Sequence, residues 1–255
     1  MIYFLDCDLS GADSVQHLID AGKVKRITIP SWTRFINTMN ELLTVVTPND
    51  LVIIDTVTKV AETLRENVLR GESPDSSLSA VHEVMKGERY GQNSYLIAQQ
   101  WFMRMVQNLY RGGEGCRIIT TAHEDLKAID PYNQTVTKKG PLLNDKFAAS
   151  LIASSTDVFR LYWTPVPILN EKGEVQFKEY TRFLQLKDSD DAIAKHHVSP
   201  KVSVGLPKAM SEPTLPKLYK RLGKKPSWLT IYGPPGIGKT TLACSEAEEE
   251  PKEKQ

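Results

Sequence analysis

The stretch Gly233-Pro234-Pro235-Gly236-Ile237-Gly238-Lys239-Thr240 decides the fold of this chain. Its G-x-x-x-x-G-K-T spacing follows the run Leu229-Thr230-Ile231-Tyr232, a predicted strand, and opens a predicted helix over Thr240–Glu250. In that context the glycines let backbone N–H groups turn toward phosphate oxygens, and the helix N-terminus attracts an anion. The alternative is a chance Gly/Pro turn. The predicted nucleotide-binding residues are Gly233, Pro234, Pro235, Gly236, Ile237, Gly238, Lys239, Thr240 and Thr241.

A second stretch supplies the acid that such a loop needs for its metal ion. Leu51-Val52-Ile53-Ile54 is wholly apolar and ends in Asp55, which is where a carboxylate would hold Mg²⁺ through water. In the loop, Lys239 is predicted to reach the β- and γ-phosphates of ATP, and the Thr240 hydroxyl to ligate Mg²⁺. The alternative for Asp55 is a cap for the following helix. The predicted cofactors are therefore ATP and Mg²⁺, with Thr240 and Asp55 at the metal.

Two further strand ends carry polar side chains. Asp6 and Asp8 follow the apolar run Ile2–Leu5, and either acid could orient or deprotonate the attacking water; a turn with Ser10 is the alternative. His123 and Glu124 follow the run Arg117–Thr121, where His123 could sense the γ-phosphate or simply bond local backbone. Because carboxyl ends of parallel strands line one crevice, the predicted catalytic residues are Lys239, His123 and one of the two acids, Asp6 or Asp8.

The order of apolar runs and helical patterns indicates an α/β fold, with a mainly parallel sheet between layers of helices. A hairpin is predicted around 171–174, a long helix over Asn93–Tyr110, an excursion over 70–92 and a long loop over 125–147. Residues 195–225 carry prolines and lysines with little periodicity, which predicts a linker. The predicted organisation is a core over 1–194, a linker over 195–225, and a strand and helix over 226–255 that complete the same core.

Two groups of basic residues have both a functional and a plain interpretation. Arg182 or Lys187 could stabilise transition-state charge, within one chain or across an interface, or could belong to a solvated strand face. The 125–147 loop could bind single-stranded DNA through phosphate contacts and stacking, or could be an ordinary surface loop. The residues that suggest DNA binding are Lys127, Tyr132, Lys138, Lys139 and Lys146.

Composition restricts the class of protein. The net charge of +1 means that any nucleic-acid surface is a local patch, and no apolar run is long enough to span a membrane. The N-terminal residues lack the basic region and cleavage site of a signal peptide. Cys7, Cys116 and Cys244 lie far apart without zinc spacing, as expected of reduced thiols in the cytoplasm.

These motifs together resemble the RecA-like phage ATPases of the Sak type, an AAA-type family of recombination accessory proteins. The matching pieces are Ile231–Thr241, Leu51–Thr56, Ile118–Glu124 and Asp157–Leu161. Phe4–Asp8 also resembles the RecA-family strand that ends in a catalytic Glu. In this comparison Asp8 takes the place of that Glu, and its side chain is one methylene shorter. The resemblance implies a RecA-like P-loop NTPase fold, ATP hydrolysis, action on single-stranded DNA and assembly as a ring or filament.

The order of the pieces departs from that family, in which the phosphate loop lies near the N-terminus. Moving residues 210–255 in front of Met1 restores the family order, so we predict a circular permutation with both termini at one surface loop. The strand ending at Tyr232 is then expected to lie beside the strand ending at Asp55. The leading functional hypothesis is a DNA-dependent ATPase. The alternatives are a nucleotide-dependent binding module with little turnover and, less favoured for want of an arginine-rich lid, a P-loop kinase.

Overall fold

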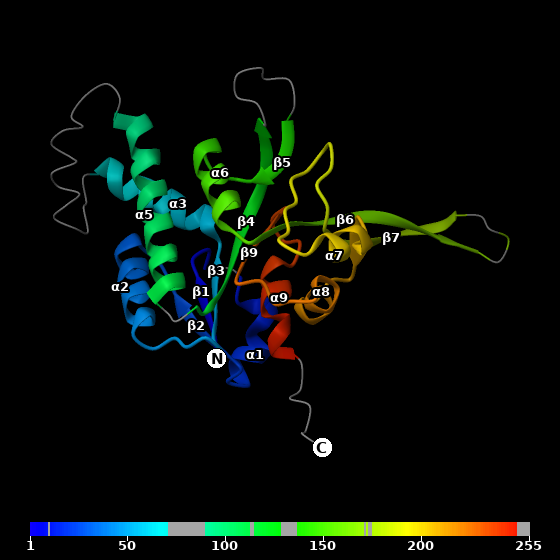
Figure 1. The fold of residues 1–255 in the computed structure, drawn as a ribbon, viewed down its shortest axis with the longest axis horizontal. Helices are drawn as coiled ribbons and strands as arrows, with labels where there is room; N and C mark the ends of the chain where they lie inside the picture. The colour runs from blue at the N-terminus through cyan, green and yellow to red at the C-terminus, as the bar shows by residue number, and fades with distance from the viewer. Residues whose placement is uncertain are drawn as a thin grey trace.

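The computed structural model describes residues 1–9, 11–70, 90–112, 115–128, 137–170, 172 and 175–248. The predicted excursion over 70–92 falls almost wholly outside this part of the chain. The described strands form one sheet in the order β2-β1-β3-β4-β9-β6-β7-β8, with β5 paired to β4 (Figure 1). Their bounds are β1 Ile2–Asp6, β2 Val24–Thr28, β3 Leu51–Asp55, β4 Arg117–Ala128, β5 Thr137–Pro141, β6 Asp157–Leu169, β7 Val175–Gln185, β8 Ala209–Ser211 and β9 Trp228–Gly233.

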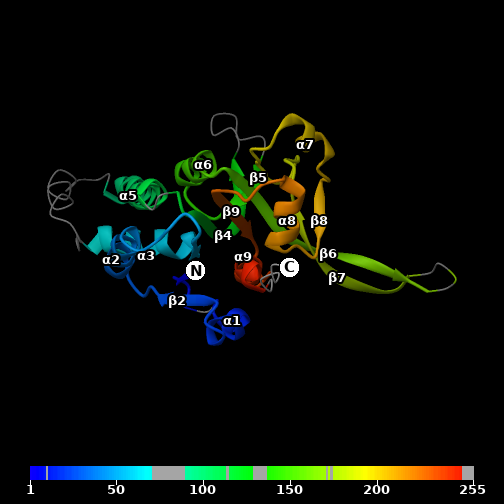
Figure 2. The same cartoon turned by 60° about the horizontal axis from the view of Figure 1, so that its bottom comes forward.

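In this spatial order, the neighbouring strands β2, β1, β3, β4, β9 and β6 are all parallel. The pairs β6–β7, β7–β8 and β4–β5 are antiparallel. The predicted α/β class and the hairpin are both confirmed, and the hairpin is longer than expected. Figure 1 and Figure 2 show its strands, β6 and β7, running well beyond the rest of the sheet as an arm. The first residues of β6, Asp157–Arg160, pair with β9. The base of this β6–β7 arm therefore lies beside the strand that leads into the phosphate loop.

Helices cover both faces of the sheet (Figure 2). Their bounds are α1 Gln16–Asp20, α2 Trp32–Leu43, α3 Val57–Arg70, α5 Tyr90–Gly112, α6 Asp145–Ser154, α7 Pro200–Gly205, α8 Leu215–Leu222 and α9 Lys239–Cys244, with short 3₁₀ turns η1 Asp13–Val15 and η2 Ser245–Glu248. One apolar cluster joins α2, α3, α5 and α6 to the sheet, and a second joins α1, α8 and α9 to the opposite face. Alternate strand residues serve the two clusters: Val52 and Ile54 the first, Ile53 the second. Burial on both faces explains why β3 reads as an unbroken apolar run.

The position of β9 differs from the prediction. We expected it beside β3, but β4 lies between them: Ile53 pairs with Ile119 on β4, and Ile119 pairs with Leu229 on β9. Each of the three strands contains an apolar run that favours burial in a parallel sheet, and such a run does not specify which strand lies next to it. The order of these strands is therefore seen only in the tertiary structure.

The predicted linker over 195–225 is wrong in its local structure. This stretch holds α7, β8 and α8 and contributes buried apolar residues to the second cluster. Leu215, Leu218 and Leu222 are buried at steps of three and four, which is a helical spacing. Thr214 caps α8 and Gly223 ends it in a left-handed conformation. Because this stretch is rich in proline and lysine, the apolar spacing of the short amphipathic helix α8 was not recognised in the sequence.

Two other predicted boundaries shift. The 125–147 stretch is not one loop, because β4 continues to Ala128, β5 spans 137–141 and α6 begins at Asp145; residues 129–136 lie outside the described part. The C-terminal α-helix ends at Cys244 rather than running to Glu250. The Ser245 hydroxyl donates to Leu242 O and accepts from Leu215 N, which ties this turn to α8. Such side-chain bonds to backbone compete with helix continuation.

Candidate functional site

The phosphate loop connects the end of β9 to the start of α9, as its spacing predicts. Two of its glycines are required by geometry. A Cβ on Gly233 would lie 2.1 Å from the Leu161 carbonyl oxygen, so β9 and β6 come too close for any side chain. Gly238 has φ of +90°, a left-handed conformation that L-residues with side chains rarely adopt. The loop backbone is therefore shaped by residues that permit it to curl around an anion.

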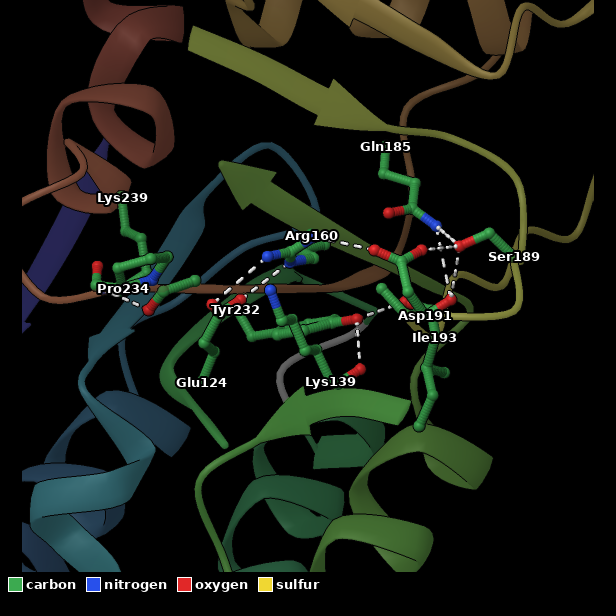
Figure 3. A network of polar contacts seen from close by, with 12 residues as sticks. Glu124, Lys139, Arg160, Gln185, Ser189, Asp191, Ile193, Tyr232, Pro234 and Lys239 are labelled. Atoms are coloured by element: carbon green, nitrogen blue, oxygen red, sulfur yellow. Dashed lines mark hydrogen bonds and ion pairs between the residues drawn. The ribbon is translucent and has the colours of Figure 1, made fainter. Parts of the chain in front are cut away.

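Lys239 lies inside the curve of this loop. Its Nζ donates hydrogen bonds to the carbonyl oxygens of Gly233 (3.1 Å) and Pro234 (2.8 Å), and only 5% of the residue is exposed (Figure 3). Burial lowers the pKa of Lys239, and the nearby Asp55 and Asp8 carboxylates oppose that shift. The ammonium is thus held against the loop by neutral backbone acceptors. A triphosphate would offer it a stronger, charged acceptor.

Asp55 joins the N-terminal half of the sequence to the phosphate loop. Its Oδ2 accepts from the Thr240 hydroxyl at 2.5 Å, and its Oδ1 accepts from the hydroxyl of Thr121 on β4. Burial raises the pKa of Asp55, while both hydroxyl bonds and Lys239 act in the opposite direction. A Cβ on Gly11 would lie 2.7 Å from Asp55 Oδ2, so the turn after β1 closes over this carboxylate.

The sequence analysis missed Thr121 and Gly11. A hydroxyl at the end of β4 was visible in the sequence, but only the pairing of β4 with β3 brings it to Asp55. Gly11 gave no signal beyond a turn residue.

Asp6 and Asp8 have different surroundings. Asp6 is fully buried and accepts two bonds from Arg26 on β2, at 2.5 and 3.0 Å. Asp8 instead faces the cavity, and its Oδ2 lies 3.7 Å from His123 Nε2. Asp6 therefore has a structural partner, whereas Asp8 is available to a ligand.

His123 lies at the carboxyl end of the sheet with Asp8. Its backbone N–H donates to the Thr58 hydroxyl at 3.1 Å, which fixes this part of β4 to α3. Burial, followed by the Lys239 charge, lowers the pKa of His123, and Asp8, Asp55 and Glu62 partly offset this. A lowered pKa favours the neutral imidazole, which can donate one hydrogen bond to a phosphate oxygen.

A cavity of about 590 Å³ unites these groups. It is lined by the predicted residues Asp8, Asp55, His123 and the loop residues from Gly236 to Thr241. Its volume lies in the range of small-molecule sites. The lining residues that the sequence analysis did not place at this site are Gly11, Ser14, Thr56, Trp163, Tyr180 and Glu212.

Of the two cations considered for transition-state charge, Arg182 lines the cavity and Lys187 does not. A Cβ on Gly238 would lie 2.8 Å from Arg182 Nη1, so the guanidinium rests against the phosphate loop of the same chain. Its Nη2 donates to Glu212 Oε2 at 3.2 Å. Lys187 Nζ makes a 3.5 Å contact with the Val204 carbonyl, away from the cavity.

A buried polar network lies behind the loop (Figure 3). Arg160 on β6 donates to Glu124 Oε2 at 2.7 Å, and its Nη1 lies 3.7 Å from Asp191. The Tyr232 hydroxyl, at the end of β9, donates to the backbone oxygens of Ile193 (2.6 Å) or Lys139 (2.9 Å). Glu124 was predicted at the nucleotide, but its carboxylate is bound to Arg160. These bonds join β6 to β4 through Arg160 and Glu124, and they join β9 to β5 through Tyr232 and Lys139.

The residues present fit a magnesium ion. Asp55 and Thr240 offer hard oxygen ligands 2.5 Å apart beside the loop. Within the described residues no group of three His, Cys, Asp or Glu side chains could hold a metal by itself. Mg²⁺ characteristically binds one or two carboxylates together with substrate phosphates rather than an all-protein cage. No described helix is both long enough and apolar enough to cross a lipid bilayer.

The chain matches a model of a known protein family. The family model described as an AAA domain matches residues 4–198, a range that ends before the phosphate loop at 233–240. None of the curated proteins compared with the chain matches it. The family match covers more than half of the 255 residues, and it includes Asp8 after β1, Asp55 at the end of β3 and His123 on β4. The chain therefore belongs to the AAA domain family of nucleotide-binding P-loop ATPases.

Proposed function

We propose that this cavity binds MgATP and hydrolyses its terminal phosphate. The observation that carries the proposal is the 2.5 Å contact between Thr240 in the phosphate loop and Asp55, residues 185 positions apart in the sequence. Beside them lies the buried ammonium of Lys239. This is the set of groups that holds a triphosphate and its metal in P-loop enzymes.

Each group has a distinct role in the proposed reaction. Lys239 exchanges its bonds to the Gly233 and Pro234 carbonyls for bonds to β- and γ-phosphate oxygens. Thr240 and Asp55 hold Mg²⁺, which neutralises phosphate charge when bound. Thr121 positions the Asp55 carboxylate by binding its other oxygen.

The attacking water lies in this proposal between Asp8 and the γ-phosphate. The water oxygen forms the new bond to phosphorus as the bond to the bridging oxygen of ADP breaks, and the water proton passes to Asp8. Neutral His123 donates a hydrogen bond to a γ-phosphate oxygen, and its 3.7 Å separation from Asp8 places both side chains at the same end of the cavity. Asp8 is then the base, and His123 reports whether the γ-phosphate is present.

ATP hydrolysis by wild type and Lys239→Ala tests this function. We expect magnesium-dependent turnover in wild type and a loss of at least about 100-fold in the variant, because removal of one transition-state donor costs about that much. Arg182→Ala tests whether the guanidinium against the loop contributes in the same chain. Turnover that is equal in wild type and Lys239→Ala would contradict the proposal.

We further propose that the ATPase acts on single-stranded DNA, as the resemblance to phage recombination ATPases implies, and that it does so as a homo-oligomer. The support is that β4, which carries His123, continues into the β4–β5 hairpin, where Lys127 and Lys138 pair in register. Lys138 binds Asp188 at 2.7 Å, so this basic surface is partly neutralised within the chain. Single-stranded DNA is expected to raise the ATPase rate and to bind in a salt-dependent manner.

A nucleotide-dependent binding module with little turnover is the second candidate. It is favoured by the short side chain of Asp8, which is one methylene shorter than the glutamate of RecA-like relatives. Asp8→Glu and Asp8→Ala separate the two. A hydrolase loses turnover in Asp8→Ala and retains it in Asp8→Glu, whereas a binding module shows equal, negligible rates in all three proteins with unchanged ATP affinity.

We also propose that the chain is a circular permutation of the family order. Three contacts near the starts of β1, β3 and β4 support the permutation. The Met1 amino group donates to Asp50 Oδ1 (2.6 Å), the Arg117 N–H donates to Asp50 O (3.1 Å), and the Arg117 guanidinium binds Glu246 at 2.6 and 2.9 Å. Met1 and the turn η2 therefore lie at the same end of the central strands, where a short connection could join them.

A further inference from the structure

Two exposed aromatic side chains line the outer part of the cavity. Trp163 on β6 is 49% exposed and Tyr180 on β7 is 68% exposed, although both are large and apolar. Within the described residues, they are the only Trp or Tyr side chains in the cavity lining. Large exposed aromatics beside a polar cavity indicate a contact with a ligand or partner.

Strand register places both rings on the face of the arm that carries Arg182. Trp163 is paired directly with Arg182, and Tyr180 lies two residues before Arg182 on β7. Because side chains of a strand alternate between faces, these three project from the same side. The intervening pair, Thr164 and Thr181, projects from the other side.

Arg182 and Tyr180 follow β7 outward from the phosphate loop, and Trp163 lies beside Arg182 on β6. Arg182 touches the loop at Gly238. Two residues along an antiparallel strand span about 7 Å, so Tyr180 lies about that far outward from Arg182, with Trp163 across from Arg182. The charged group is therefore nearest the phosphate site, and the flat apolar surface is next to it, which is the order of phosphate and base in a nucleotide.

We propose that Trp163 and Tyr180 form a stacking wall for the base of the nucleotide whose phosphates lie in the loop. The inference rests on the proposed nucleotide site and adds a specific base contact, made by the β6–β7 arm. An aromatic wall stacks on any base through its π-face, so it favours nucleotide over phosphate without strong discrimination among bases. The continuity of the cavity from Lys239 and Thr241 to both rings favours this occupant over a nucleic-acid strand or a second copy of the chain.

The test compares binding of ATP with binding of inorganic triphosphate by calorimetry. Trp163→Ala and Tyr180→Ala are each expected to weaken ATP binding by about 5- to 100-fold, the range for loss of one stacked base, and to leave triphosphate binding unchanged. Val175→Ala, an exposed position of the same arm outside the cavity lining, is the matched control and should change neither. Both aromatic side chains are largely exposed, so the variants are expected to fold, and thermal unfolding checks this.

The experiment distinguishes an incorrect stacking wall from an incorrect nucleotide site. If wild type binds neither ligand, the nucleotide site itself is wrong. If wild type binds both and the aromatic variants bind ATP as wild type does, the stacking wall is wrong. Loss of DNA binding or of self-association in Tyr180→Ala, with ATP affinity unchanged, would assign the aromatics to a macromolecular partner and overturn the inference.

Tryptophan fluorescence gives a second readout. ATP is expected to quench the tryptophan fluorescence of the wild-type protein, and the Trp163→Phe variant should lose this quenching. Inorganic triphosphate should cause little quenching in either protein. Trp101→Phe on α5, outside the cavity lining, is the control and should retain the change. Quenching by ATP that persists in Trp163→Phe would contradict stacking on this ring.

Discussion

Asp55 is held at the site by two hydroxyls that come from different parts of the sequence, Thr121 on β4 and Thr240 of the phosphate loop. Groups that orient a metal ligand are typically worth 10- to 100-fold in metal affinity. We expect Thr121→Val to raise the Mg²⁺ concentration for half-maximal ATP binding by about that factor. Thr120→Val is a buried neighbour whose hydroxyl contacts Thr230 instead of Asp55, and it should leave the Mg²⁺ requirement unchanged. An equal shift in both variants would indicate general destabilisation.

His123 predicts a pH dependence of stability. Burial and Lys239 lower its folded-state pKa below the ordinary 6.5, so the folded protein favours the neutral ring. Its contribution to stability is full above pH 6.5 and is lost as the pH falls toward the folded-state pKa, because the unfolded chain then binds the proton more readily. The drop in melting temperature between pH 7.5 and 5.5 should be smaller in His123→Asn than in wild type. His17→Asn, at an exposed position, should keep the wild-type drop.

At the scale of an element, α8 decides whether residues 195–225 are a spacer or part of the core. Leu218 is fully buried on this helix, in the second apolar cluster with residues of the sheet and of α9. Leu218→Ala is expected to lower the free energy of unfolding by about 2–5 kcal/mol, the range for a buried leucine. Lys220→Ala, exposed on the same helix, should stay within about 0.5 kcal/mol of wild type. Denaturant unfolding measures both, and an unchanged Leu218→Ala would place α8 outside the cooperative unit.

At the scale of the whole molecule, the proposed permutation predicts that the order of segments can be restored. A chain with residues 210–255 placed before Met1 should fold, melt near the wild-type temperature and bind ATP with similar affinity, because the site contacts are the same and the new chain ends fall in β8, an edge strand paired on one side only. A control chain reopened inside β9, between Leu229 and Thr230, should fail to fold, since β9 is buried and paired on both sides. Equal failure of both chains would contradict a shared core with a tolerant junction.

The sequence by itself determined the local chemistry: the phosphate loop, the acid at the end of β3, the polar residues after β1 and β4, and the α/β class. These follow from spacing and apolar runs, which are properties of neighbouring residues. It did not determine that β4 separates β3 from β9, that Thr121 and Gly11 meet Asp55, that Arg182 and two aromatics of the β6–β7 arm reach the cavity, or that α8 is part of the core. The apolar run of a parallel strand favours burial but does not specify the neighbouring strand, so only the tertiary structure showed which residues became neighbours.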